Sequence, residues 1–172
     1  MSSFAHQVEY RSVPVAIPDD FLLSAPAKPL VVKPVPFASS GLPEYGNCYA
    51  VTIDDILSQE ECEILTRLAE SSVPRTRAPD FSPWQPAMVS LGMGFEVLSS
   101  EYRDSDRIIW DEQEMVDRIW ARCVQAEGLE ERLAVVTEEE DRVFGIPKWD
   151  FRHVNKRMRF LRYSKGQYFK RK

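Results

Sequence analysis

The chain has 172 residues, of which 44% are hydrophobic and 28% are charged. These values are ordinary for a globular protein and, at this length, predict a single domain. The formal net charge is −5 at pH 7, and this acidic balance argues against a protein that mainly binds nucleic acid. The three cysteines form no C-x-x-C pair, which disfavours a disulfide framework and a structural zinc site.

The N-terminus and the hydropathy pattern indicate in which cellular compartment the protein is expected. Residues 1–10 contain no apolar stretch of the kind that a signal peptide needs, and no apolar run approaches the ~20 residues of a membrane-spanning helix. We therefore predict a cytoplasmic or nuclear protein with no transmembrane segment. Cys62 and Cys123 fall on the apolar faces of predicted helices, which favours buried, reduced thiols.

Residues 1–46 are rich in proline and hold seven of the 12 prolines of the chain. Proline fixes φ and removes a backbone donor, so helices and central strands are disfavoured there. The alternation in residues 30–37 predicts extended or polyproline II backbone. Two interpretations stay open: a flexible N-terminal arm, and an arm that packs along the domain or binds a partner. The remaining residues, 47–172, are predicted to form one partial domain.

That domain is predicted to begin with a strand and a helix. Residues 47–53 are rich in β-branched and aromatic side chains and predict a strand. Ser58 and Glu61 have the spacing of a capping box, in which each residue bonds the backbone amide of the other. A helix is therefore expected over residues 58–71.

The stretch from residue 75 to the second helix is predicted to be mostly irregular. Prolines mark residues 75–86 as a loop, in which Trp84 is either an anchor or a packed lid residue. Residues 91–98 predict a strand that two glycines weaken. Residues 99–111 are polar and charged, and Asp111 at their end is expected to cap a second amphipathic helix.

The C-terminal part is predicted to end in strands. A short helix is expected over residues 129–136, followed by a turn-rich connection over residues 144–155. Residues 157–163 predict a strand whose side chains point alternately to two faces. One face is expected to carry Arg157, Arg159, Leu161 and Tyr163, and the other Met158, Phe160 and Arg162. A turn at residues 164–166 leads to a second extended segment that starts at Gln167.

The stretch from Asn155 to Lys170, NKRMRFLRYSKGQYFK, resembles the first core strands of the prolyl 4-hydroxylase-like branch of the 2-oxoglutarate/iron(II) dioxygenases. In that family a segment of the form R-x-R-x-x-R-Y-x-x-G-Q-Y-F leads within a few residues into an H-x-D motif. The upstream order of strand, capped helix, acidic loop and helix is also similar. YRDSDRIIWD, from Tyr102 to Asp111, looks like an R-x-x-x-R-x-x-x-D loop near the active-site mouth of such proteins.

The resemblance covers roughly residues 46–170 and carries an expectation about fold. It implies an α+β fold that consists of the N-terminal helices and first strands of a double-stranded β-helix, the jelly-roll or cupin-like architecture, in incomplete form.

The resemblance also implies Fe(II) and 2-oxoglutarate, with ascorbate as a further candidate, as cofactors of the full-length family. Two histidines and one carboxylate hold the iron in such enzymes and leave open positions for the cosubstrate and dioxygen. The family places its H-x-D motif after the position of Lys170, where this sequence reads Arg171-Lys172 and stops. We therefore expect the chain as given to lack the iron ligands and to be inactive alone, as a splice product, a mispredicted gene or a degenerate copy.

Tyr163 is the candidate cosubstrate residue. By resemblance it takes the place of a strand tyrosine that hydrogen-bonds 2-oxoglutarate in related hydroxylases; a half-buried strand tyrosine with its hydroxyl at the rim is the alternative. His6 lies in the arm and His153 lies before the last strand, and the resemblance gives a metal role to neither. Arg107 and Asp111 are candidates for a substrate-binding loop, although a helix cap explains Asp111 equally well.

Three functions are compatible with the sequence. The first is a dioxygenase-family chain whose parent hydroxylates an unactivated carbon of a prolyl residue or a small metabolite. The second is a non-catalytic interaction module on the same scaffold, which would use the Pro-rich arm or the Trp84 loop. The third is nucleic-acid binding through the basic C-terminal tail, with Tyr163, Tyr168 and Phe169 as stacking platforms, which the acidic net charge disfavours. The sequence does not indicate the substrate, and strand edges left unpaired predict self-association.

Overall fold

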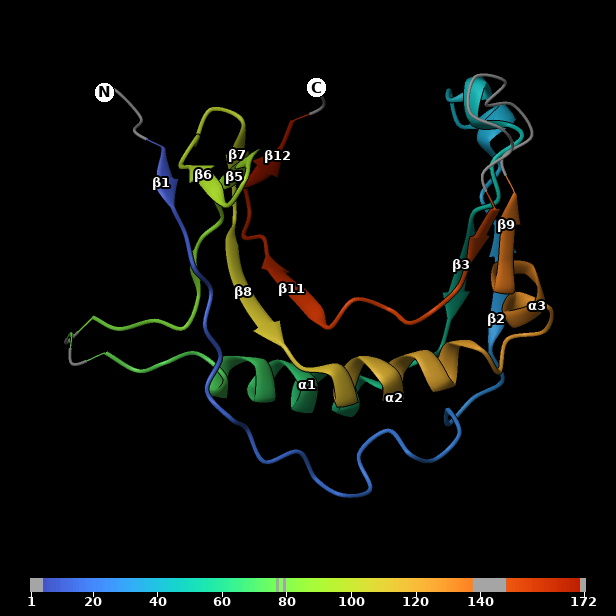
Figure 1. Cartoon of the computed structure of the whole chain (residues 1–172), viewed down its shortest axis with the longest axis horizontal. Helices are drawn as coiled ribbons and strands as arrows, with labels where there is room; N and C mark the ends of the chain where they lie inside the picture. Colours follow the sequence, from blue (N-terminus) through green and yellow to red (C-terminus); the bar gives the residue numbers. More distant parts are fainter. Residues whose placement is uncertain (1–4, 77, 79, 138–147, 171–172) are drawn as a thin grey trace. The chain divides into compact units, whose positions relative to one another are not determined.

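The computed structural model describes residues 5–76, 78, 80–137 and 148–170 and divides the chain into two compact units (Figure 1). Unit 1 comprises Met1–Pro18, Cys62–Gln113 and Asn155–Lys172, and unit 2 comprises Asp19–Glu61 and Glu114–Val154. The mixed class of helices and sheets that the sequence predicts is confirmed. Within the described residues the strands form several antiparallel sheets and no closed barrel. None of the helices described is long and apolar enough to cross a membrane.

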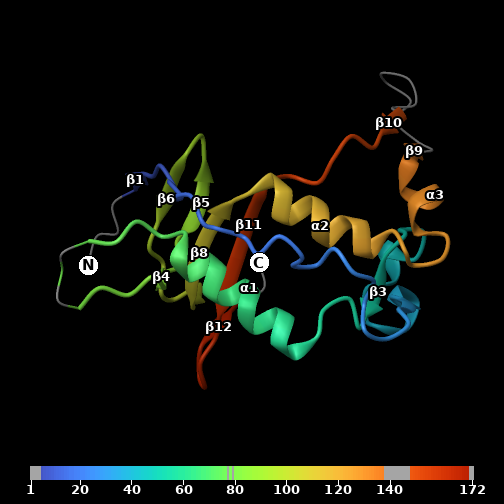
Figure 2. The same ribbon diagram turned by 90° about the horizontal axis from the view of Figure 1, so that it is seen from below.

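The described residues of unit 1 form three small antiparallel sheets, with the strand orders β11-β8-β4, β1-β6-β5 and β12-β7. The strands are β1 (His6–Gln7), β4 (Gln85–Pro86), β5 (Val89–Gly92), β6 (Phe95–Val97), β7 (Arg103–Asp104), β8 (Asp106–Asp111), β11 (Arg157–Arg162) and β12 (Tyr168–Phe169). Two perpendicular views show β8 and β11 side by side (Figures 1 and 2). The predicted strands near residues 157–163 and after Gln167 are therefore present.

The pairing of β8 with β11 buries one face of this sheet. Met158 lies opposite Trp110, and Phe160 lies opposite Ile108. Paired residues of antiparallel strands point to the same side, so these four side chains share a face. Trp110 and Ile108 are only 1% and 2% exposed, and the Trp110 and Phe160 ring centroids lie 6.5 Å apart. The core of unit 1 is built around this face.

The loop that the resemblance implies from Tyr102 to Asp111 is wrong, because Asp106–Asp111 form β8. Ile108, Ile109 and Trp110 are all buried. A strand that is covered on both faces reads as a continuous apolar run and lacks the alternation that marks a half-exposed strand. Charged residues on either side of this short run therefore concealed the strand.

The single strand expected over residues 91–98 is instead a β-hairpin formed by β5 and β6. Gly92, Met93 and Gly94 have φ values of 91°, 51° and 78°. Glycine adopts such left-handed conformations readily, so the two glycines that appeared to weaken one strand form the turn between two.

Helix α1 (Gln59–Ser71) confirms the helix predicted after the capping box. The Glu61 amide donates to Ser58 Oγ at 3.2 Å, and the Ser58 amide donates to Glu61 Oε2 at 2.8 Å. Leu65 is 8% exposed, whereas Cys62 is exposed and not buried as predicted. The apolar stripe is therefore covered only over its later turns.

In the part of unit 2 that the structure describes, the strands form two antiparallel pairs, β2-β3 and β9-β10. Its elements are β2 (Val31–Pro34), η1 (Phe37–Ser39), η2 (Pro43–Tyr45), β3 (Val51–Asp54), α2 (Gln113–Cys123, which belongs to unit 2 from Glu114 onward), α3 (Leu129–Ala134), β9 (Val135–Thr137) and β10 (Lys148–Asp150). The strand predicted over residues 47–53 begins only at Val51, and part of the connection predicted over residues 144–155 lies outside the described residues. The segment predicted to be extended near residues 30–37 pairs with β3 as β2.

Candidate functional site

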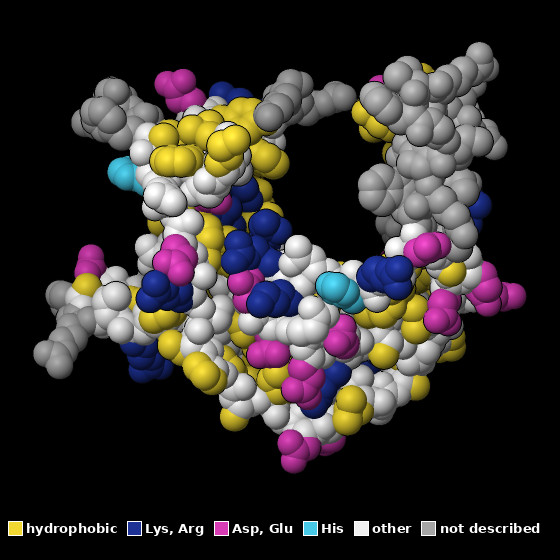
Figure 3. All heavy atoms as spheres, viewed as in Figure 1, with side chains coloured by type: hydrophobic (Ala, Val, Ile, Leu, Met, Phe, Trp, Pro, Cys, Tyr) yellow, Lys and Arg dark blue, Asp and Glu magenta, His cyan; other side chains and the backbone are white. Residues whose placement is uncertain are grey.

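The charged face of the β8-β11 pair is the candidate site. Arg157 lies opposite Asp111, Arg159 opposite Ile109, and Leu161 opposite Arg107. These residues therefore point away from the Trp110 side, as the predicted alternation of residues 157–163 requires. We call the surface formed by Arg107, Arg157, Arg159 and Asp111 the arginine face; Lys and Arg side chains gather over β8 and β11 in Figure 3.

Arg107 is the most deeply buried cation of the arginine face, with 8% of its side chain exposed. Its Nη2 donates to Glu96 Oε2 at 2.7 Å, and its Nη1 donates to the Met88 carbonyl oxygen at 3.4 Å. The Tyr10 hydroxyl accepts from Arg107 and donates to Glu96. The buried guanidinium is thus paired and hydrogen-bonded, which a charge at this depth requires.

Arg157 and Asp111 form a two-pronged ion pair across β11 and β8. Arg157 Nε and Nη2 donate to the two Asp111 carboxylate oxygens at 2.8 and 2.6 Å. These hydrogen bonds lower the pKa of Asp111 against the opposing effect of burial, and the charges of Lys156 and Arg159 lower it further. Such bidentate pairs fix geometry as well as charge, so Asp111 is neither a helix cap nor a free ligand.

Arg159 is exposed and makes no ion pair or side-chain hydrogen bond within the described part of the chain. Three arginines therefore face two carboxylates, those of Glu96 and Asp111, and one positive charge is left over. A face of this kind attracts a small anion.

Tyr163 directly follows β11, and the alternation of that strand directs it to the arginine face. Its side chain is 44% exposed, and its hydroxyl bonds to none of the described residues. The hydroxyl can therefore donate to a bound anion. The structure brings Tyr163 and the arginines onto one face, with Leu161 between Tyr163 and Arg159.

Arg107 and Asp111, which were predicted on a substrate-binding loop, are both on β8 and ion-paired there. The error follows from the missed strand. Sequence reasoning also missed Tyr10 and Glu96, which complete the surroundings of Arg107. The alternation of Val8 and Tyr10 with the charged Glu9 and Arg11 is the sequence signal that could have found Tyr10.

No three His, Cys, Asp or Glu side chains come together to hold a metal ion within the described residues. His6 lies in β1 of unit 1, and His153 is an exposed residue of unit 2. The donor set of an iron site with two histidines and a carboxylate is therefore not assembled by the residues described, and we derive no reaction step through iron.

Trp84 is an anchor in the structure. Its Nε1 donates to Glu70 Oε1 at 2.6 Å, and the Arg162 guanidinium lies 4.7 Å from the ring centroid. Arg162 also pairs with Asp106 at 2.8 Å. These contacts fasten the end of the 75–86 loop to the sheet of unit 1.

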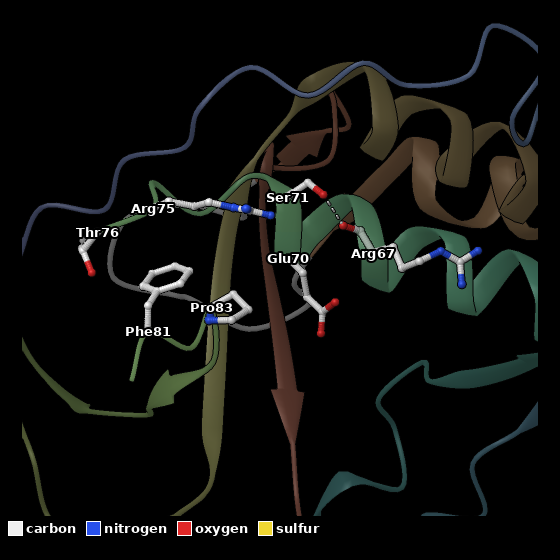
Figure 4. Close-up of a pocket in the computed structure, with 7 residues that line it drawn as sticks. All are labelled: Arg67, Glu70, Ser71, Arg75, Thr76, Phe81 and Pro83. Carbon is white, nitrogen blue, oxygen red and sulfur yellow. Dashed lines mark hydrogen bonds between the residues drawn. The ribbon is translucent and has the colours of Figure 1, made fainter. Parts of the chain in front are cut away.

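A shallow pocket lies between that loop and the end of α1 (Figure 4). The rings of Phe81 and Pro83 lie next to each other, and the Arg75 side chain extends toward Ser71, whereas the Arg67 guanidinium points away. The charged groups that line the pocket do not converge on one point, so this pocket is a weaker candidate for a binding site than the arginine face.

The aromatic residues of the C-terminal tail are engaged within unit 1. The Tyr168 hydroxyl donates to the Ser100 carbonyl oxygen at 2.8 Å. The Phe169 ring packs edge-on against Tyr102 at 5.4 Å, with the Arg103 guanidinium 4.8 Å from its centroid. Both side chains stay partly exposed, at 38% for Tyr168 and 56% for Phe169, so these contacts hold the rings in place without covering them.

Comparisons of the chain with protein-family models, with curated proteins and with solved structures found no match.

Proposed function

We propose that the chain is the N-terminal portion of a 2-oxoglutarate/Fe(II)-dependent dioxygenase of the prolyl 4-hydroxylase-like branch. In this proposal β8 and β11 are the first core strands of a double-stranded β-helix, and the arginine face is the wall of the cosubstrate site. The observation that carries the proposal is the position of Tyr163, at the end of β11 and on the same face as three arginines. The local strand–turn–strand order of residues 157–169 agrees with the resemblance.

The chemistry assigned to this chain is cosubstrate contact. 2-Oxoglutarate carries two carboxylates, and the leftover positive charge of the arginine face favours such an anion. The Tyr163 hydroxyl donates to a carboxylate oxygen, while the ion pairs of Arg107 and Arg157 hold those side chains in place. We expect the chain by itself to be inactive, because its sequence contains no match to the H-x-D motif with which the family binds iron.

The test is an anaerobic titration with Fe(II) and 2-oxoglutarate, followed by the charge-transfer absorbance of the ternary complex. It uses the 172-residue chain and the longest product that the transcript encodes. We expect no band from the former and a band from the latter. Tyr163→Phe should weaken 2-oxoglutarate binding to the longer product by roughly tenfold, because one hydrogen bond to a charged group is lost.

Tyr168→Phe is the matched control, because it removes a hydroxyl that bonds Ser100 and lies off the arginine face. Affinity for 2-oxoglutarate should stay unchanged in that variant. A transcript that encodes no longer product, or a longer product that gives no band, would overturn the proposal.

A non-catalytic interaction module is the second candidate, and the β5-β6 hairpin favours it. Leu91, Met93 and Phe95 near its turn are 59%, 97% and 41% exposed, and apolar side chains gather at this end of unit 1 in Figure 3. Exposed apolar patches mark interaction surfaces. Alanine at Met93 and Phe95 should then abolish partner capture without changing 2-oxoglutarate binding; unchanged capture would argue against this candidate.

A further inference from the structure

Residues 5–13 lie on unit 1 as an extended segment. His6 and Gln7 pair antiparallel with Glu96 and Phe95. The Val8 amide then donates to the Gly94 carbonyl oxygen at 3.0 Å. Main-chain hydrogen bonds to the edge of β6 thus hold the first end of the segment in place.

Hydrogen bonds also hold the other end of the segment in place. The Val13 amide donates to the Ser72 carbonyl oxygen at 2.8 Å, and the Asp111 amide donates to Ser12 Oγ at 3.2 Å. The segment therefore spans from the hairpin β5-β6 to the end of β8, with backbone bonds at both ends.

Side chains along the segment alternate between the two sides, as they do in a strand. Val8, Tyr10 and Ser12 are part-buried. Glu9 and Arg11 point outward, with 74% and 75% of their side chains exposed, and pair only with each other at 2.9 Å. The side chains at the even-numbered positions 8, 10 and 12 are therefore the ones that pack against the rest of unit 1.

Tyr10 occupies a socket that matches a neutral phenol. Its hydroxyl bonds both Glu96 and Arg107, so the socket supplies one acceptor and one donor. The ring centroid lies 5.1 Å from the Arg107 guanidinium and 5.9 Å from that of Arg157, distances at which cations favour an aromatic face. Burial, followed by the hydrogen bond to Glu96, raises the pKa of Tyr10 to about 12, so the phenol stays protonated at neutral pH.

We propose that the strip of unit 1 beneath residues 5–13 is a peptide-binding track. It takes an extended segment with a β-branched residue, a tyrosine and a small hydroxyl residue at alternate positions. The chain's own N-terminal segment is its resident occupant, and a segment of the same pattern from a partner protein replaces it. Recognition has two parts: the edge of β6 supplies main-chain bonds, as in strand addition, and the Glu96–Arg107 socket supplies side-chain specificity.

The resident segment makes few enough contacts with unit 1 that another peptide can displace it. It is joined to unit 1 by a few main-chain bonds, by the hydroxyls of Tyr10 and Ser12 and by the Tyr10 ring, while the outward Glu9 and Arg11 form an ion pair with each other. Segments with few buried contacts open locally at low free-energy cost. Once it leaves, the edge of β6 and the socket are free for another strand.

The experiment measures the fluorescence anisotropy of a labelled peptide of residues 5–14 with the full-length chain. The wild-type chain keeps its own segment in place and should bind the peptide weakly. Tyr10→Ala in the chain weakens the resident segment, so the peptide should bind at least about tenfold more tightly. Ser12→Ala, a milder change that loses one hydrogen bond, should give an intermediate gain.

Controls separate the track from unspecific binding. Glu9→Gln in the chain changes an outward residue and should leave peptide binding at the wild-type level. A peptide with Tyr10→Ala should bind neither chain. Equal binding of the peptide to the wild-type and Tyr10→Ala chains would overturn the proposal. So would the absence of binding to both the Tyr10→Ala and the Ser12→Ala chain, when circular dichroism shows that both are folded. Iron and 2-oxoglutarate are absent from this assay, so its outcome is independent of the proposed enzymatic role.

Discussion

Arg122 is a buried cation whose hydrogen bonds hold separate stretches of unit 2 together. Its side chain is 1% exposed, and it donates to the carbonyl oxygens of Ser24 and Ile56 at 3.1 and 3.0 Å. Two further bonds, at 2.9 and 2.8 Å, reach the carboxylate oxygens of Glu61. One guanidinium thus joins three stretches of chain that are distant in sequence, and its rigid fork of donors suits this task.

Replacing Arg122 by Ala should destabilise the chain by about 3–5 kcal/mol, because a partly buried carboxylate and two carbonyl groups lose their partner. Urea unfolding followed by circular dichroism measures this change. Arg122→Lys should recover only part of the loss, since an ammonium cannot make the same set of bonds. An effect as small as that of Arg152→Ala, a change at an exposed position, would contradict the assigned role.

The ion pairs of Glu61 and Asp111 predict an acid-sensitive fold. The hydrogen bond from Arg122 lowers the pKa of Glu61, and that from Arg157 lowers the pKa of Asp111, in both cases against burial. A carboxyl group with a lowered folded-state pKa stabilises the fold fully above its unfolded value, near 4, and loses this contribution as the pH falls through the folded value.

The free energy of unfolding should therefore be constant above about pH 5 and decrease below pH 4. Urea titrations at a series of pH values measure it. Glu61→Gln and Asp111→Asn should each be less stable near neutral pH and show a flatter acid limb. A variant with the wild-type slope would show that its carboxylate is not linked to folding.

At the scale of elements, local sequence decides where a helix starts but not which strands pair. The capping box at Ser58 is visible in the sequence because both of its partners are three residues apart. The sequence does not reveal β8 as a strand, because both of its faces are buried in the tertiary structure and its apolar residues therefore do not alternate with polar ones. Its partners β11 and β4 come from segments on either side of it in the chain.

Ser58→Ala should destabilise the chain by about 1 kcal/mol, since the Glu61 amide at the start of α1 loses its acceptor. Thermal unfolding of the variant measures the loss. Ser58→Asp keeps an acceptor at the cap and should retain most of the stability. A wild-type melting temperature for Ser58→Ala would show that the cap contributes nothing.

At the scale of the whole molecule, each unit is assembled from stretches that are far apart in sequence. Unit 1 brings the first 18 residues, a central stretch and the C-terminal residues together. Such a fold depends on non-local contacts, which form slowly and leave strand edges open during folding. Among the described residues, β5 and β11 are edge strands of their sheets.

Self-association through such an edge remains a prediction. Leu161 in β11 is 44% exposed, and a lysine placed on an edge strand discourages pairing with another chain. Leu161→Lys should therefore lower the self-association measured by sedimentation equilibrium across a range of concentrations. Cys62→Lys, at an exposed position of α1, is the control; an equal decrease there would point to net charge instead of the edge.

Predictions from sequence succeeded where the signal is local. The capped helix at residues 59–71, the helix at 129–134 and the strand at 157–162 are present. Two faces of the last strand were also predicted, so Tyr163 and the arginines were placed on one side before any contact was known. Tyr10 and Glu96 could not be predicted as partners of Arg107, since they lie 97 and 11 residues from it.

The sequence by itself determined the acidic composition, the helix cap and the two-faced strand of residues 157–162, because each depends on residues a few positions apart. Only the tertiary structure decided that a charged stretch becomes the central strand β8, and that residues 5–13 of a Pro-rich segment lie along unit 1 with Tyr10 between Glu96 and Arg107. The physical reason is that burial and long-range pairing set these outcomes. A buried strand loses its alternation, and the socket that holds the Tyr10 phenol forms only where β6 and β8 bring Glu96 and Arg107 together.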